Sequence, residues 1–114
     1  MGYRSEIILV VGKEALPLFM TALAKEPEAR ALCYSHADKR LDNYEDGAVL
    51  FHWDHIKWYD SFKEVAVIEE FMNDCDTEDL EDHYRFVRIG EETDDNEVRG
   101  WGFDHIYITR SVEY

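Results

Sequence analysis

His52, Asp54 and His55 are the residues whose types and spacing could do chemistry in this chain. Imidazole and carboxylate groups are ordinary ligands of zinc and other divalent metals. The three residues could therefore be the centre of a small metal- or nucleotide-binding protein or of an enzyme. On a strand, however, His52 and Asp54 share one face and His55 points to the other. We therefore expect histidines at a strand end without metal and keep the metal site as the alternative. Further ligands could come from His36, His83, Asp104 and His105.

Established catalytic motifs are absent from the sequence. It has no GxSxG, HExxH, GxGxxG or Walker-type phosphate-binding run. The acidic run 74–82 contains too few apolar residues to raise a carboxylate pKa by burial, as a general acid requires. We expect a protein that is not an enzyme and that carries no cofactor.

The segment 47–62, GAVLFHWDHIKWYDSF, must position the two histidines. Residues 48–54 are typical of a buried strand, and Asp46-Gly47 between this run and the strand-like run 39–44 predicts a hairpin. Ser61 and Glu64 have the spacing of a capping box, which predicts a helix start. The inward face of that helix is predicted to hold Val65, Ile68, Met72 and Cys75.

The remaining elements follow from hydrophobic periodicity. Residues 3–11 form an apolar run typical of a central strand. A helix with Pro17 in its first turn should follow, and Pro27 should end it or begin a second short helical turn. Its apolar stripe consists of Leu16, Phe19, Met20 and Leu23. Later strands are predicted over 84–89, 97–101 and 106–112, and glycines on both sides of Trp101 indicate a close backbone approach.

This order of elements predicts the fold class. With 114 residues, of which 46% are hydrophobic, the chain can bury one core and is too short for two. We expect a single α+β domain over residues 1–114, with a mainly antiparallel sheet and two helices on one face. The order β-α-β-β-α-β with additional C-terminal strands is ferredoxin-like.

The cysteines and the apolar segments indicate the compartment. Cys33 and Cys75 form no CxxC pair and no zinc-like spacing, so we expect reduced thiols. The apolar run 7–11 is too short for a signal peptide or a membrane span. We expect a cytoplasmic protein.

The acidic charge points to the kind of partner. The net charge is −14, from 12 basic and 26 acidic residues, and residues 1–40 are nearly balanced. A field of this sign repels the nucleic-acid backbone and attracts a basic protein surface. The acid runs within 69–82 and 91–97 could present carboxylates in place of phosphates and occupy a nucleic-acid-binding channel of another protein, although a solvated face is the alternative for each run.

Large aromatic side chains beside these runs would be natural anchors for a partner. The predicted partner-binding residues are Glu70, Asp74, Asp76, Glu78, Asp79, Glu81, Asp82, Glu91, Glu92, Asp94, Asp95 and Glu97, together with Trp58 and Tyr59.

Four stretches carry a resemblance to a known group of proteins. They are the opening MGYRSEI, Ile-Lys-Trp-Tyr at 56–59, FVRIGEETDDNEV at 86–98 and Tyr-Ile-Thr-Arg-Ser at 107–111. With these stretches the chain resembles a family of small proteins encoded by tailed bacteriophages and prophages that open with Met-Gly-Tyr-Arg-Ser. The resemblance implies an infected bacterial cytoplasm as the setting and assigns no site residue.

Three functional hypotheses follow. The first is a non-enzymatic, phage-encoded inhibitor or modulator of a host defence or nucleic-acid-processing protein, which binds a basic host surface and contacts neither nucleic acid nor membrane directly. The second is the metal- or nucleotide-binding centre at His52, Asp54 and His55. The third is a structural protein that associates with itself, for example as a homodimer.

Overall fold

A computed structural model describes residues 2–92 and 94–106. Within these residues a five-stranded sheet and three α-helices form. The elements are β1 (Ser5–Val11), α1 (Leu16–Ala24), α2 (Pro27–Tyr34), β2 (Lys39–Leu41), β3 (Val49–Ile56), α3 (Lys63–Thr77), the 3-10 helix η1 (Glu81–His83), β4 (Tyr84–Ile89) and β5 (Asn96–Arg99).

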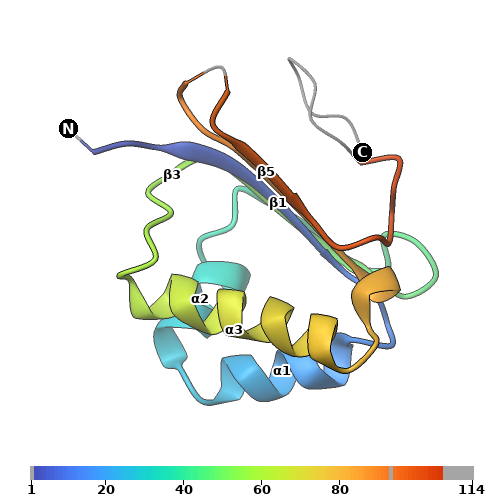
Figure 1. Ribbon diagram of the computed structural model, residues 1–114. Helices are drawn as coiled ribbons and strands as arrows, with labels where there is room; N and C mark the ends of the chain where they lie inside the picture. Colours follow the sequence, from blue (N-terminus) through green and yellow to red (C-terminus); the bar gives the residue numbers. More distant parts are fainter. Residues whose placement is uncertain (1, 93, 107–114) are drawn as a thin grey trace.

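The sheet confirms the predicted α+β, ferredoxin-like class. Its strand order is β2-β3-β1-β4-β5, and every neighbouring pair is antiparallel. The order of the first four strands is the ferredoxin-like one, and β5 adds an edge strand beside β4. The helices all lie on one face of the sheet, with α1 and α2 in the first crossover and α3 in the second (Figure 1).

β1 is the centre of the sheet because its residues are apolar on both faces. Ile7 to Val11 are fully buried, and the strand pairs with β3 on one side and β4 on the other. Ile7, Leu9 and Val11 point into the core beneath the helices. Ile8 and Val10 belong to a smaller cluster on the opposite face, which also contains Leu50, Val87 and Ile106.

Proline divides the first crossover into two helices. α2 begins at Pro27, where the missing N–H costs little, and the Glu26 carboxylate accepts a hydrogen bond from the Glu28 N–H at 3.1 Å. Phe19 and Leu23 of α1 are buried as predicted. Met20 is 48% exposed, so its predicted place in the core is wrong: the narrow stripe of this short helix leaves it at the solvent edge.

The predicted capping box is also wrong. α3 begins at Lys63 with Phe62 as its N-cap, and no side chain caps it. The Phe62 N–H bonds the Tyr59 carbonyl at 2.9 Å, and this turn starts the helix one residue beyond the cap that Ser61 would provide. The buried face of α3 holds the four predicted residues and Phe71.

Most strand ends differ from the prediction: β1 begins at Ser5 and not at residue 3, and β5 covers Asn96–Arg99 and not 97–101. β2 stops at Leu41, because Asn43 and Asp46 adopt positive φ in the predicted hairpin turn. β3 continues to Ile56, past the predicted end at residue 54. Of the predicted last strand, Ile106 is buried, and positions 107–112 lie outside the described residues.

The predicted close approach at Gly100 is confirmed. Its φ is +84°, and a Cβ there would lie 2.2 Å from the Tyr84 carbonyl oxygen. The neighbouring Trp101 N–H bonds the Glu81 carbonyl at 2.7 Å, which closes this end of the chain over η1. None of the helices in the described part of the chain has the length and apolar character needed to cross a bilayer.

Candidate functional site

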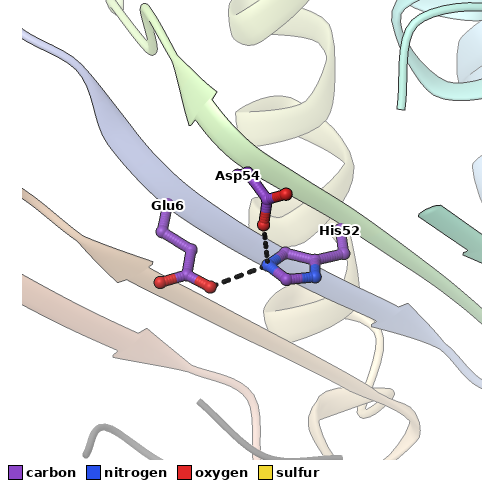
Figure 2. A group of neighbouring side chains, drawn as sticks. All are labelled: Glu6, His52 and Asp54. Carbon is purple, nitrogen blue, oxygen red and sulfur yellow. Dashed lines mark hydrogen bonds and ion pairs between the residues drawn. The ribbon is translucent and has the colours of Figure 1, made fainter. Parts of the chain in front are cut away.

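Three side chains that could bind a ligand converge on the sheet face opposite the helices. His52 Nε2 lies 2.7 Å from Glu6 Oε2 and 3.1 Å from Asp54 Oδ1. Figure 2 shows both carboxylates directed at this one nitrogen. The side chains of His52, Glu6 and Asp54 are 12%, 30% and 69% exposed. We refer to these three residues as the sheet cluster.

Strand register brings Glu6 into the sheet cluster. Ile8 pairs with His52, and the β1–β3 register shifts between Ser5 and Ile7. Glu6 therefore reaches the same face as His52 and Asp54 from the neighbouring strand. Its participation has no signal in the sequence, because Glu6 and His52 are 46 positions apart.

The other predicted ligands lie elsewhere. His55 is exposed on the opposite side of β3 from Asp54, as the strand alternation requires. His83 forms an ion pair with Glu14, and His105 contacts Glu45. The predicted trio is thus corrected: His52 and Asp54 come together, and Glu6 takes the place of His55.

The first acid run lies at the C-terminal end of α3 and in η1. We call these residues the α3-end acids: Asp74, Asp76, Glu78, Asp79, Glu81 and Asp82. Leu80 N–H bonds the Cys75 carbonyl at 2.8 Å and Asp79 has a φ of +59°, which is a Schellman end with aspartate in the left-handed position. Only Asp76 of the six has a side-chain hydrogen bond or ion pair within the described residues, to Tyr84 and Arg99.

The second acid run covers the turn between β4 and β5 and the beginning of β5. We call these the turn acids: Glu91, Glu92, Asp94, Asp95 and Glu97. Most of them bind groups of the protein itself. Arg88 contacts Asp95 at 3.0 Å and Glu97 at 3.4 Å, and the Arg4 N–H bonds the Glu91 carboxylate. The Arg88 hydrogen bond, followed by one from Tyr3, lowers the pKa of Asp95.

The two acid runs lie at opposite ends of β4 (Figure 1). β4 contains six residues, which corresponds to about 20 Å at the rise of an antiparallel strand. A partner that contacted both runs would have to span this length. The unpaired carboxylates are concentrated at the α3 end, because the turn acids mainly hold the turn against the N-terminal segment.

Arg99 connects β5 to α3. Its guanidinium contacts Glu69 at 2.9 Å and Asp76 at 3.1 Å, and it donates to Asn73 Oδ1 at 2.9 Å. Burial, followed by the nearby charge of Glu97, raises the pKa of the Glu69 carboxyl. This ion-pair group fixes the helix that carries the α3-end acids.

The two predicted aromatic anchors are not equivalent. Trp58 is only 8% exposed and packs in the core between Trp53 and Phe86, so the prediction of a surface anchor there is wrong. Tyr59 is half-buried, and its ring packs on Phe62 at a centroid distance of 5.1 Å. The most exposed tryptophan is Trp101, at 74%. It is not among the predicted partner-binding residues.

A shallow groove lies between α1 and α3, beside the α3-end acids. Its apolar lining includes Leu18, Ala22, Val67 and Phe71. Its rim carries Glu26, Glu70 and Asp74, with Lys25 as the one basic residue that lines it. Such a groove suits a long cationic side chain, whose hydrocarbon stem packs on the apolar lining while its charge reaches the rim.

Comparison with known proteins gives no relative of this chain: no family model matches it, and neither does a curated protein or a solved structure.

Proposed function

We propose that this protein is a non-enzymatic binding protein whose α3-end acids contact a basic surface of another protein. The groove between α1 and α3 extends this contact surface through Glu70 and Asp74. The turn acids are secondary contacts. In the setting that the sequence resemblance implies, the partner is a host defence or nucleic-acid-processing protein, and this chain is a phage-encoded modulator of it.

Acidic side chains at the C-terminal end of α3 carry the proposal, because their charges destabilise the helix to which they belong. Helix C-termini have a partial negative charge, so acids there destabilise the helix. α3 nevertheless ends with Asp74, Asp76 and the C-cap Glu78, and no base lies in its last turn. Asp79 occupies the left-handed position in which glycine is preferred. Local preferences broken together at one place are typical of functional surfaces.

The alternative reading, a merely solvated acidic face, requires no such placement. Acids in the middle of a helix would solvate the surface equally well. So would acids at a helix N-terminus, where they interact favourably with the helix dipole. The groove adds a feature that a solvated face lacks, because apolar and carboxylate side chains line it together. Electrostatic complementarity of this kind accelerates association with a basic partner.

The test is affinity capture from bacterial lysate with identification of the retained protein. We expect one basic protein to be retained at low salt and released as salt rises, because the Debye length falls from about 30 Å at about 0.01 M to about 3 Å at about 1 M. Reversal of the α3-end charges in the double variant Glu78→Lys/Asp82→Lys should abolish retention. These side chains have no ion-pair partner within the described residues, so folding should be preserved.

The matched control is Glu92→Lys/Asp94→Lys, which makes the same charge change with two exposed acids at the other end of β4. It should weaken retention much less. The proposal fails if no protein is retained specifically, if both double variants bind equally, or if retention is insensitive to salt.

A further inference from the structure

We propose that the sheet cluster is a binding site for one divalent transition-metal cation of the zinc class, with Glu6, His52 and Asp54 as its ligands. This site is separate from the proposed partner surface. It lies on the sheet face opposite the helices (Figure 2), whereas the α3-end acids lie at the end of α3, which covers the other face, and in η1 (Figure 1).

The geometry is that of three donors around one point. One nitrogen and two carboxylate oxygens lie within 4.8 Å of one another. A cation at ordinary distances of about 2.0–2.2 Å from each donor requires separations of about 3–4 Å, which small side-chain rotations provide. The donors come from the paired strands β1 and β3, and sites on such rigid elements are more precise than sites on loops.

The two carboxylates that face Nε2 carry more negative charge than one proton neutralises, which favours a divalent cation. The Nε2 atom of His52 can donate one hydrogen bond, and two carboxylates compete for it at 2.7 and 3.1 Å. A divalent cation would replace this single proton, bind Nε2 through its lone pair and neutralise both carboxylates at once. Because the cation binds the Nε2 lone pair, any proton on Nε2 must leave when the cation binds.

The donor set selects the class of metal. Imidazole suits Zn²⁺, Co²⁺, Ni²⁺ and Fe²⁺, whereas Mg²⁺ and Ca²⁺ prefer sites made of oxygen alone. Three protein ligands leave a coordination position for water, since Asp54 is at the solvent edge of the cluster. Lys39, which pairs with His52 from β2, brings a positive charge to the same face and should limit the affinity.

The test uses the full chain after treatment with a chelator and titrates it with Zn²⁺ by calorimetry and with Co²⁺ by visible absorption. We expect one ion per chain in the wild-type protein. Zn²⁺ at about 100 times the Kd should raise the Tm by about 10 °C. His52→Gln and Asp54→Asn should each weaken binding at least about 10-fold, because even the loss of an outer-shell partner has an effect of this size.

The controls separate the sheet cluster from the general acidity of the chain. His55→Gln removes the exposed histidine of the same strand and Glu92→Gln removes an exposed turn acid; both should bind as the wild type does. Asp54→Asn changes a carboxylate that is 69% exposed, so its effect is readable even if His52→Gln does not fold. The proposal is overturned if Asp54→Asn binds like the wild type, if the controls lose binding equally, or if no saturable binding occurs up to about 1 mM.

Discussion

Two neighbouring tryptophans in the core differ in what their indole N–H groups do. The Trp53 indole donates a buried hydrogen bond to the Leu32 carbonyl at 3.1 Å and so connects β3 to α2. The Trp58 indole nitrogen is buried without a hydrogen-bond partner among the described residues. Their rings pack at a centroid distance of 5.6 Å. The two indole rings therefore share an apolar environment, but among the described residues only the Trp53 indole N–H has a hydrogen-bond partner.

We predict that Trp53→Phe destabilises the fold by about 1–3 kcal/mol more than Trp58→Phe does. Both changes remove similar aromatic area, but only the first leaves a buried carbonyl unpaired. Urea unfolding followed by circular dichroism measures both free energies of unfolding. Equal losses in the two variants would show that the hydrogen bond from Trp53 to Leu32 contributes nothing.

At the scale of elements, the edge strand β5 is held to α3 by side chains as well as to β4 by its backbone. Arg99 lies opposite Phe86 in the β4–β5 register, so its side chain points to the helix face and reaches Glu69, Asn73 and Asp76. The guanidinium offsets acids on a helix that has no base in its last turn. The same contact orients the surface that we propose for partner binding.

We predict that Arg99→Ala lowers the free energy of unfolding by about 1–3 kcal/mol, between the values typical of exposed and buried ion pairs. Removal of the guanidinium leaves the half-buried Glu69 carboxylate beside Glu97 without a cation. Urea unfolding is the measurement. Lys13→Ala is the control. Both side chains of the Lys13–Asp46 ion pair are exposed, so this pair should contribute less than about 1 kcal/mol to the free energy of unfolding. Similar losses in the two variants would contradict the role of Arg99.

At the scale of the whole molecule, the excess of acid acts against compaction. A net charge of −14 on 114 residues produces self-repulsion in the folded state. The turn acids reduce it locally through Arg88, but the α3-end acids do so only at Asp76. The chain folds in spite of this repulsion, because the buried apolar residues of β1, β3 and α3 stabilise the folded state.

We predict that the Tm rises by several degrees as NaCl increases from about 0.01 M to about 0.15 M, because screening shortens the Debye length from about 30 Å to about 8 Å. Differential scanning calorimetry gives the Tm. The double variant Glu78→Gln/Asp82→Gln should start from a higher Tm and respond less to salt. A Tm that falls with salt would mean that attractive ion pairs outweigh the repulsion.

The sequence by itself determined the class of fold. The doubly apolar run of β1, the turn glycine before β3 and the helical stripe of α3 are local patterns, and each formed its element because backbone geometry repeats over a few residues. It also indicated that His52 and Asp54 share a face, which strand alternation alone requires. Element boundaries were less exact, because Phe62 and the Tyr59 turn, rather than Ser61, set the start of α3.

Only the tertiary structure decided which distant residues meet. Glu6 joins His52 because strand register is set by packing across the whole sheet. Trp58 is buried because β4 brings Phe86 against it. The two acid runs look alike in the sequence, yet Arg88, Arg4 and Tyr3 bind the turn acids while the α3-end acids remain largely unpaired. Local pattern sets the elements, and contacts between residues far apart in the chain set the site.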